Sequence, residues 1–484
     1  MSGESTNGDS KRLRGTEADG SPVETTKTFR VIPVDHLGNQ FPGKHAKVKL
    51  GPRVRSQVPY SNVMHEEQGV QIHILSGPPN KAKGVPEDFD MVYPRCGPRA
   101  ELFFQPDKVR AGIVTCGGLC PGLNSVVRDV TLSLIELYGA KEVLGFTGGW
   151  EGIYARPPMV LTPENTNGIQ NLGGTVLKSA RGGFDLEKIL GRLEELEIDQ
   201  LYVIGGDGTM RGAAALSQGA RARSRPIAIV GIPKTIDNDI DLIDRSFGFQ
   251  TAIEETLRAV RSARVEASCS INGVGIVKVM GRNAGFIATH VALAAGDVDL
   301  CLIAEVPIVA DRSDQCQFKH VAKVVKERGS AVIVVAEGAG EEIFGKSAQV
   351  DAGGNRKLPE IGPWMKDQVV NCLKAENVPC TVKYIDPSYM VRSCPANASD
   401  ALYCLILSQG AVHTAMAGLT NCMVGLVNGR SVILPIAKVV ATSPRSVDPR
   451  GRTWERVVSL TGQPHQSEVL PKPDSKGLMS HTVI

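Results

Sequence analysis

The 484-residue chain lacks the features that mark membrane, secreted or nucleic-acid-binding proteins. No apolar run approaches the roughly 18 residues that a transmembrane helix needs. The net charge is only +3, which is too small to indicate nucleic acid or a membrane surface as a partner. The eleven cysteines show no paired secretory spacing, and no hydrophobic signal segment precedes them. We therefore expect reduced thiols inside a cell.

Metal-ligand spacing is also missing. Cys116 and Cys120 flank a pair of glycines, but no second Cys/His pair accompanies them, so we do not expect a zinc site. What the chain does have is a high glycine content (52 residues) and a modest aromatic fraction of 5%. This composition is typical of an α/β enzyme, and the length suits two or three domains.

The most informative stretch holds two apolar runs, each followed by a polar loop. Residues 201–204 read as a buried strand that leads into Gly-Gly-Asp-Gly-Thr (residues 205–209) and a helix from 210 to 217. Residues 227–232 read as a second strand, which ends in Pro-Lys-Thr-Ile-Asp-Asn-Asp (residues 233–239). Because ligands of open α/β sheets bind beyond the carboxyl ends of the strands, we expect both loops at one site.

The residue types of the two loops fit phosphoryl transfer. Glycines let the backbone approach a polyanion, and Asp207 could then act on Mg²⁺, directly or through water. Asp237 and Asp239 are two residues apart, so in extended backbone they would point the same way, and one could accept a proton from a hydroxyl nucleophile. Lys234 and Thr235 are placed for the transferring group. Either loop alone could be a tight turn, but the two together favour the chemistry.

A second glycine-rich loop begins the regular fold. Residues 110–115 predict a strand, followed by the loop 116–122 and a helix through about residue 138. The loop is neither a Walker A motif nor a GxGxxG fingerprint. It can be a phosphate cradle or a turn that needs positive φ at glycine.

The order of these motifs resembles that of the 6-phosphofructokinase family. Diacylglycerol and NAD kinases share only Gly-Gly-Asp-Gly-Thr, whereas here the resemblance resumes at Met-Gly-Arg (280–282), Ala-Glu-Gly (336–338) and Tyr-Met-Val-Arg (389–392). It spans roughly residues 110 to 427. The resemblance implies an ATP-dependent 6-phosphofructokinase, with MgATP and fructose 6-phosphate as substrates.

The resemblance also implies roles for individual residues. The residues that would bind ATP are Gly117, Arg181, Gly182, Gly206, Asp207, Gly208 and Thr209, and Asp207 would also serve Mg²⁺. Asp237 would be the general base, with Thr235, Lys234 and Arg282 as the other catalytic residues. The sugar phosphate would be bound by Thr235, Ile236, Asp237, Met280, Gly281, Arg282, Glu337, Lys383, Tyr389, Met390, Val391 and Arg392.

Several positions resemble a particular branch of that family. Gly273, Lys383 and Tyr389 depart from the bacterial pattern and, with Lys234, resemble the pyrophosphate-dependent enzymes and the long kinetoplastid or plant-like branch. The kinetoplastid resemblance implies a homotetramer, activation by AMP and a glycosomal location. The last five residues, Ser-His-Thr-Val-Ile, are not a Ser-Lys-Leu-type address, so the location rests on the resemblance alone, with the cytoplasm as the alternative.

The expected fold is α/β, with two Rossmann-like three-layer α/β/α domains flanking an active-site cleft and an irregular N-terminal extension. We expect a disordered N-terminus at 1–28, an arm at 29–105, an ATP-binding domain at 106–241 with a returning helix at about 394–418, a fructose 6-phosphate-binding domain at 242–393, and a segment at 419–484 that completes and wraps the core. Two alternatives stay open: a pyrophosphate-dependent phosphofructokinase, and a catalytically silent regulatory subunit. The second would be expected to lack Asp237 or Arg282, and both are present.

Overall fold

The computed structural model describes residues 91–310, 315–345 and 358–465, several short stretches before residue 91 (15–16, 22–23, 30–44, 46–49, 64–65 and 68–71), and residues 313 and 349. Within the N-terminus predicted to be disordered, only the paired strands β1 (Gly15–Thr16) and β2 (Pro22–Val23) are described, and the rest of that prediction lies outside the described residues. In the described part of the chain, no helix is long and apolar enough to cross a membrane.

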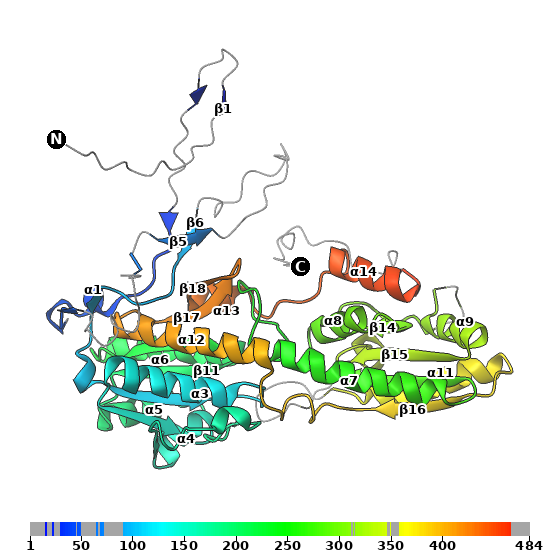
Figure 1. The fold of residues 1–484 in the computed structure, drawn as a ribbon, viewed down its shortest axis with the longest axis horizontal. Helices are drawn as coiled ribbons and strands as arrows, with labels where there is room; N and C mark the ends of the chain where they lie inside the picture. Colours follow the sequence, from blue (N-terminus) through cyan, green and yellow to red (C-terminus); the bar gives the residue numbers. More distant parts are fainter. Residues whose placement is uncertain are drawn as a thin grey trace, which may run out of the picture.

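A seven-stranded sheet forms the first domain (Figure 1). Its strand order is β10-β9-β8-β11-β12-β17-β18. The bounds are β8 Arg110–Thr115, β9 Glu142–Phe146, β10 Met159–Val160, β11 Gln200–Gly205, β12 Ala228–Pro233, β17 Cys422–Val427 and β18 Arg430–Pro435. The five middle strands are parallel, and β10 and β18 close the edges in antiparallel pairing. Strands from residues 422–435 thus complete a sheet that begins at residue 110.

Helices cover both faces of this sheet. One face carries α3 (Leu123–Leu132), its π-helical continuation η3 (Ser133–Tyr138) and α12 (Ala398–Met416). The other carries α4 (Gly149–Ala155), α5 (Leu186–Glu195), α6 (Asp207–Ala222) and α13 (Ile436–Thr442). Along β11, Tyr202 and Ile204 pack with the first set, while Leu201 and Val203 pack with the second. This alternation, with both faces buried, explains why the strand reads as an unbroken apolar run.

The second domain has a four-stranded parallel sheet of order β14-β15-β13-β16. Its strands are β13 (Gly273–Val279), β14 (Leu300–Leu302), β15 (Ser330–Ala336) and β16 (Thr381–Ile385). One face is covered by α7 (Phe249–Ser268) and α8 (Phe286–Ala295), with α14 (Arg452–Thr461) against α8. The other face is covered by α9 (Gln317–Arg328) and α11 (Ile361–Ala375). The predicted fold class, two three-layer α/β/α domains, is confirmed.

The smaller elements belong mainly to the N-terminal arm. They are β3 (Arg30–Val31), α1 (Leu37–Gln40), η1 (Pro42–Lys44), β4 (Val48–Lys49), β5 (Gly69–Gln71), β6 (Met91–Pro94), β7 (Glu101–Leu102), η2 (Pro106–Lys108), η4 (Ile169–Asn171) and α10 (Glu341–Phe344). The arm packs on the first domain, since Leu37 N donates to Gly418 O and Cys96 N donates to Ser431 O.

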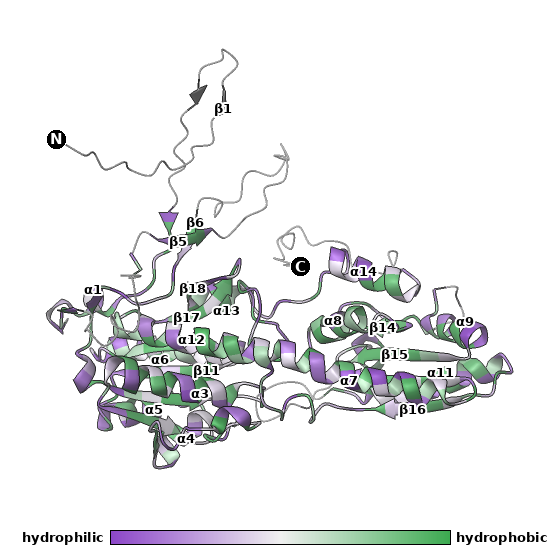
Figure 2. Ribbon diagram, viewed as in Figure 1, coloured by the Kyte–Doolittle hydropathy of each residue, from purple (hydrophilic) through white to green (hydrophobic). Residues whose placement is uncertain are grey.

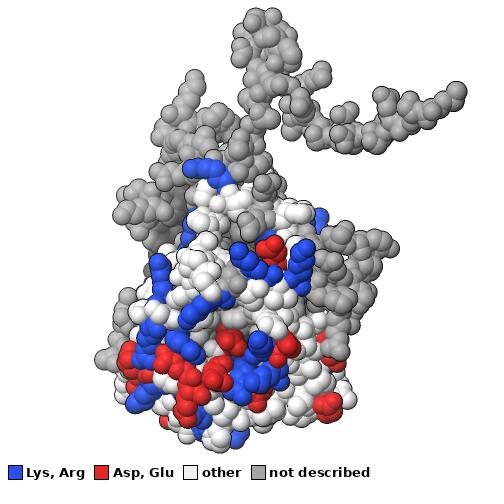
Figure 3. Space-filling view, turned by 90° about the vertical axis from the view of Figure 1, so that its left-hand side faces the viewer, with Lys and Arg blue, Asp and Glu red and all other residues white. Residues whose placement is uncertain are grey.

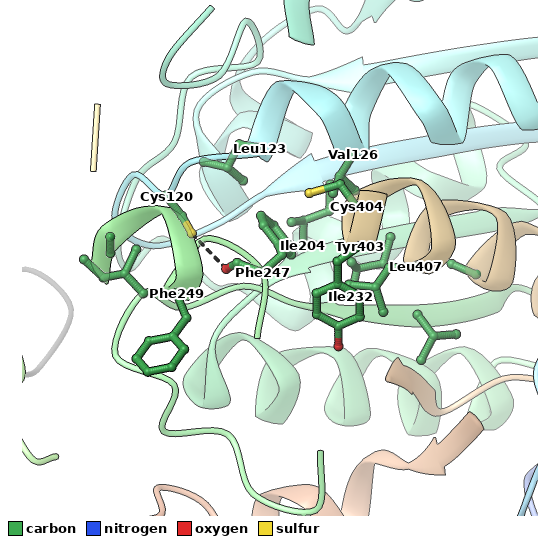
Figure 4. Close-up of a cluster of buried hydrophobic side chains, with 14 of the residues drawn as sticks. Cys120, Leu123, Val126, Ile204, Ile232, Phe247, Phe249, Tyr403, Cys404 and Leu407 are labelled. Atoms are coloured by element: carbon green, nitrogen blue, oxygen red, sulfur yellow. Dashed lines mark hydrogen bonds between the residues drawn. The ribbon is translucent and has the colours of Figure 1, made fainter. Parts of the chain in front are cut away.

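The two domains share a continuous apolar core where the chain crosses between them. Figure 4 shows Cys120, Phe247, Phe249 and Tyr403 in this core, with the Cys120 thiol donating to the Phe247 carbonyl at 3.2 Å. Figure 2 shows the helices banded purple and green, as expected for helices with one buried and one exposed face.

The surface charge is mixed in sign. Figure 3, which views the first-domain end, shows basic and acidic side chains interleaved on that face. The first domain contains ion pairs such as Arg110–Glu197 and Arg223–Glu194. The view fits the small net charge of +3.

Candidate active site

The three loops predicted to bind phosphate do meet at one edge of the first sheet. They follow β8, β11 and β12, which are adjacent and parallel. Two backbone hydrogen bonds join them, from Cys116 N to Ile204 O and from Lys234 N to Gly205 O, each 2.9 Å long. The loops therefore extend from a common edge at the carboxyl ends of the strands.

Gly117 and Ser179 fix the conformation of the first loop, residues 116–122. Gly117 has φ 89°, a left-handed conformation that favours glycine, and its N–H donates to Ala180 O at 3.0 Å. The Ser179 hydroxyl donates to Gly117 O at 2.8 Å, which fixes the loop against residues 179–182. Gly182, with φ 74°, turns the chain there.

Two arginines predicted to serve different substrates converge on this loop. A Cβ placed on Gly118 would lie 3.6 Å from Arg181 Nη2 and 4.0 Å from Arg392 Nη1. Arg181 comes from the first domain, and Arg392 comes from the segment that returns from the second. The loop thus lies beside one arginine from each of these two segments.

Helix α6 begins at Asp207, three residues before the predicted start, so residues 207–209 form its first turn. The prediction of a loop through Thr209 is wrong because Gly206 provides an N-cap and the helix takes over at once. The unpaired N–H groups of this turn suit phosphate. The structure also pairs Asp207 with Arg211 at 2.6 Å, an i,i+4 contact that the sequence analysis did not consider.

Two of the three glycines of this motif, Gly205 and Gly208, have different surroundings. A Cβ at Gly205 would lie 2.4 Å from Thr209 Cβ, so Gly205 allows the tight turn between strand and helix. A Cβ at Gly208 would have Arg211 Nη1 as its nearest neighbour, at 4.0 Å. Position 208 therefore faces open space.

Lys234 contacts the glycine-rich loop at residues 116–122. Its side chain is only 5% exposed, and its ammonium group donates to Gly118 O at 2.7 Å. Burial lowers the pKa of this lysine, while the nearby Cys120 and Cys116 thiols act in the opposite direction. A buried ammonium beside a phosphate loop can contact the transferring group of a donor.

Asp237 occupies the junction of the two domains. Burial, followed by repulsion from Asp239 and Glu337, raises its pKa to about 8, while Arg282 and Lys234 oppose the rise. Its Oδ1 atom is buried and accepts no hydrogen bond within the described part of the chain. A buried carboxylate with a pKa near neutrality and an unused acceptor is suited to general base catalysis.

The loop does not run in extended backbone as anticipated, so the period-two argument for Asp237 and Asp239 does not apply. Asn238 has φ 56°, a left-handed turn that is fixed by a 2.9 Å bond from Ser246 N to Asn238 Oδ1. Asn tolerates this conformation better than most residues. The two carboxylates stay close enough for the charge of Asp239 to raise the pKa of Asp237.

Asp239 also interacts with Asp207 of the first domain. Its pKa is raised by burial and then by the charge of Asp207, while a hydrogen bond from the Thr235 hydroxyl lowers it. The Thr235 hydroxyl also accepts a bond from Asp237 N at 3.1 Å. In the described residues no group of three or more His, Cys, Asp or Glu side chains is placed to hold a metal. Two carboxylates, however, fit Mg²⁺, which usually takes one or two from the protein and the rest from phosphates and water.

The second domain contributes loops after β13 and β15 that lock together. Glu337 N donates to Val279 O at 2.9 Å, and Gly338 N donates to Gly281 O at 3.2 Å. A Cβ on Gly338 would lie 1.9 Å from Arg282 O, so only glycine allows this contact. Arg282 and Glu337 are thereby held side by side.

Glu337 shares the charge environment of Asp237. Burial raises its pKa, and the opposing charges are Arg282, Lys278 and Arg392. Lys278 also forms a 2.6 Å ion pair with Asp386. Lys278 and Asp386 belong to the site although the sequence analysis did not single them out. Their only signal was a position near the end of predicted strands.

The residues of segment 389–392 differ in their exposure to solvent. Tyr389 and Met390 are each 75% exposed, whereas the Val391 side chain is buried. The Arg392 guanidinium lies 4.9 Å from the centre of the Tyr389 ring. The predicted residues Ile236 and Met280 are buried and part-buried against the core.

Lys383 is not brought to the other predicted residues within this chain. It lies in the middle of β16, opposite Gly275, and its ammonium is 3.8 Å from Glu266 near the C-terminal end of α7. The site lies near the N-terminal end of that helix.

Comparisons with known proteins identify the family of this chain. A family model described as "Phosphofructokinase" matches residues 110–415. The chain is 46% identical over 373 residues to "ATP-dependent 6-phosphofructokinase 7" of Arabidopsis thaliana, covering 76% of each chain. It is 40% identical over 411 residues to an "ATP-dependent 6-phosphofructokinase" of Trypanosoma cruzi, covering 83% of this chain and 84% of that one.

The fold has a match among solved structures. A pyrophosphate-dependent phosphofructokinase from Marinobacter aquaeolei superposes with a TM-score of 0.61 at 21% identity, covering 76% of this chain and 94% of that one. At this identity the likeness concerns the fold alone. Because the family model spans the strands and loops that build the site and the identities extend over most of the chain, the chain belongs to the phosphofructokinase family.

Proposed function

We propose that the chain is an ATP-dependent 6-phosphofructokinase, a glycolytic kinase that transfers the γ-phosphoryl group of MgATP to the 1-hydroxyl of D-fructose 6-phosphate. The observation that carries this proposal is the position of Asp237. Its buried carboxylate lies between the phosphate loops of the first sheet and Arg282 and Glu337 of the second. The relatives named ATP-dependent 6-phosphofructokinase support the same activity.

Asp237 acts as the general base in this proposal. A pKa of about 8 leaves part of the carboxylates ionised near neutral pH and makes each a better proton acceptor than an ordinary aspartate. Thr235 contacts the substrate and the transferring group. Arg282 and Lys234 place positive charge around that group, as positioning and electrostatics dominate phosphoryl transfer.

The first domain, residues 106–241 with the returning helix, binds ATP. The proposed contacts are Gly117, Arg181, Gly182, Gly206, Gly208 and Thr209. Asp207 would hold Mg²⁺, and the neighbouring Asp239 fits a second carboxylate ligand. When bound, the ion would neutralise phosphate charge. Asp207 would then have to share or release Arg211, which now holds it.

The second domain, residues 242–393, binds the sugar phosphate. Arg392 offers a guanidinium fork for the phosphate, and Glu337 can accept hydrogen bonds from sugar hydroxyls. The remaining proposed contacts are Ile236, Met280, Gly281, Lys383, Tyr389, Met390 and Val391. Within the single chain, Lys383 lies near Glu266 and does not reach the proposed site. Homotetramer formation, activation by AMP and a glycosomal location are further proposals, supported by resemblance to the kinetoplastid branch.

The donor is the point at which a second function competes. Lys234 accompanies pyrophosphate use in this family, whereas Gly208 stands where pyrophosphate-using relatives carry a second aspartate. An aspartate at 208 would intrude on the space and charge of a nucleotide α-phosphate, and glycine leaves that space open. Lys234 can bind the phosphoryl group of either donor. We therefore give Gly208 more weight and propose ATP.

A donor assay tests this choice. Turnover of fructose 6-phosphate is measured with MgATP and with pyrophosphate, for the wild type, Gly208→Asp and Gly191→Asp. Gly191 lies on α5 with open space around it, so it is a matched control for the added carboxylate. We expect strong ATP activity and negligible pyrophosphate activity in the wild type and the control, and loss of ATP use in Gly208→Asp. Robust wild-type turnover with pyrophosphate would replace the proposal by the pyrophosphate-dependent enzyme. No turnover with either donor would favour the silent subunit.

A further inference from the structure

The segment between α13 and α14, residues 443–447, crosses from the first domain to the second (Figure 1). It is far from the catalytic motifs in sequence and carries none of the family motifs noted above. Its contacts nevertheless fall on the two loops that carry Asp237 and Arg282. We refer to residues 443–447 as the strap.

Arg445 is the centre of the strap. Its side chain donates to three backbone carbonyls of the loop after Asp237. The bonds are Nε to Asn238 O at 2.8 Å, Nη1 to Ile243 O at 2.9 Å and Nη2 to Asp244 O at 3.3 Å. Its backbone N–H donates to Asp239 O at 2.8 Å. Arg445 therefore holds the turn residue Asn238 and the chain that follows it as far as Asp244.

The other face of the Arg445 guanidinium contacts the second domain. It lies 5.2 Å from the centre of the Phe286 ring, at the start of α8. Planar stacking and a five-donor fork are properties of arginine that lysine does not share. The contacts of Arg445 thus involve the whole guanidinium group and not only its charge.

Glu305 fixes the strap to the loop that carries Arg282. Its carboxylate accepts Gly285 N at 2.9 and 3.1 Å, and it accepts Val447 N at 2.7 Å. Gly285 is three residues beyond Arg282. A Cβ at this glycine would lie 2.9 Å from Glu305 Oε2, which shows how close the contact is.

Ser443 completes the first-domain side of the strap. Its hydroxyl accepts Asp241 N at 2.9 Å. The backbone of residues 238–244 thus makes five hydrogen bonds with the strap, whereas the 282–285 loop is joined to the strap through Glu305. Both loops are held by the same five residues.

We infer that Arg445 is a positioning residue for the phosphoryl transfer, which fixes the loop of Asp237 and Asp239 and, with Glu305, sets its distance from the loop of Arg282. This inference rests on the proposed function for its catalytic consequence, while the contacts themselves do not depend on it. Misplacement of reacting groups by about 1 Å can cost on the order of 10²-fold in rate. The effect should therefore appear in kcat more than in KM.

The variants are Arg445→Ala, Arg445→Lys and Glu305→Gln, with Arg452→Ala as the control. Arg452 is an exposed arginine at the start of α14 whose side chain pairs with Glu455. We expect kcat to fall about 10- to 100-fold in Arg445→Ala, with KM for both substrates within about threefold. Arg445→Lys keeps the charge but not the fork, so its kcat should stay at least fivefold below wild type. Arg452→Ala should match wild type.

The lysine variant separates positioning by contact from an effect of charge. Arg445→Lys keeps the positive charge but cannot make the three guanidinium bonds to Asn238, Ile243 and Asp244, so its kcat should stay below that of wild type. If lysine restores kcat to the wild-type value, the fork has no positioning role and the inference is wrong.

Hydrogen–deuterium exchange tests the strap without reference to activity. Peptides that cover residues 238–244 and 282–285 should exchange faster in Arg445→Ala and, for the second loop, in Glu305→Gln, but not in Arg452→Ala. Unchanged exchange, or wild-type kcat in Arg445→Ala, overturns the inference. If Arg445→Ala does not fold, Arg445→Lys and Glu305→Gln decide by the same criteria. An inactive wild type with the expected exchange pattern would instead count against the proposed function.

Discussion

Asp237 combines three properties that are costly for folding and useful for chemistry. It is buried, it lies close to Asp239 and Glu337, and its Oδ1 accepts no hydrogen bond in the described part of the molecule. Unsatisfied buried polar atoms are uncommon in stable proteins. Such a side chain is better explained by a role in chemistry than by a role in the fold.

The first prediction concerns the rate. Asp237→Asn removes the proton acceptor while keeping the shape of the side chain, so kcat should fall about 10²- to 10⁴-fold. The KM for fructose 6-phosphate should change little, because binding groups such as Arg392 remain. Asp367→Asn, at an exposed position of α11, is the matched control. Steady-state kinetics with MgATP checks the split, and a variant with near wild-type turnover would remove Asp237 from the mechanism.

The second prediction concerns stability and pH. The pKa of Asp237 rises from an ordinary 3.8 to about 8 on folding, so between these values the folded state binds more protons than the unfolded state. Stability from this group is therefore lost as pH rises through that window. Asp237→Asn is neutral throughout, so it should unfold at a higher temperature than wild type at pH 8, and the difference should vanish near pH 4. Calorimetry at both pH values checks this, and a constant difference would contradict it.

Other residues of the site could not be found from the sequence. Arg445 and Glu305 act on loops that lie 201 and 20 residues away, so no spacing pattern connects them with the motifs. The turn between Asp237 and Asp239 depends on one left-handed residue, Asn238, and a period-two pattern cannot predict such a turn. The motif glycines were predictable, because strand–glycine–helix turns leave a local signature.

At the scale of elements, the predicted strand bounds were accurate where an apolar run forms a buried strand. The bounds of β8 agree with the predicted strand at 110–115, and those of β11 and β12 differ by one residue at each end from the predicted strands at 201–204 and 227–232. Strand β14 ends at Leu302, although Ile303 and Val306 are also buried. Apolar residues that pack in a loop read like a strand, so composition alone overestimates strand length there.

Helices α7 and α12, which follow the two crossings of the chain between the domains, are joined at their N-terminal ends. Gly248 caps α7 without a side chain, and the buried carboxylate of Asp400, from the first turn of α12, supplies the missing acceptor. Asp400 Oδ2 accepts Thr251 N at 2.7 Å and the Thr251 hydroxyl at 2.6 Å. The two crossings of the chain are thereby fixed to each other.

The third prediction tests this junction. Asp400→Ala should lower the free energy of unfolding by about 2 kcal/mol, the upper end of the range for a lost N-cap, because the Thr251 groups stay buried. Asp185→Ala removes the N-cap bond of α5 to Lys188 N at an exposed position and should cost less. Urea denaturation of both variants gives the comparison. Equal losses would show that Asp400 is an ordinary cap.

At the scale of the whole molecule, two sheets present the carboxyl ends of their strands to one site. The charges that set the pKa of Asp237 include Lys234 from the first domain and Arg282 and Glu337 from the second. The sequence predicted two α/β units in series, and the fold confirms them. How the units face each other depends on the shared core around Phe247 and on the strap, which involve contacts that are distant in sequence.

The central claim is that loops of both domains act in one transition state, and a double-mutant cycle tests it most directly. The value of kcat/KM is measured with MgATP and fructose 6-phosphate for wild type, Asp237→Asn, Arg282→Ala and the double variant. Residues that act as a unit are strongly non-additive, so the double variant should lose no more than about tenfold beyond the worse single variant. Single losses that simply multiply in the double variant would contradict the account, because Asp237 and Arg282 would then act independently.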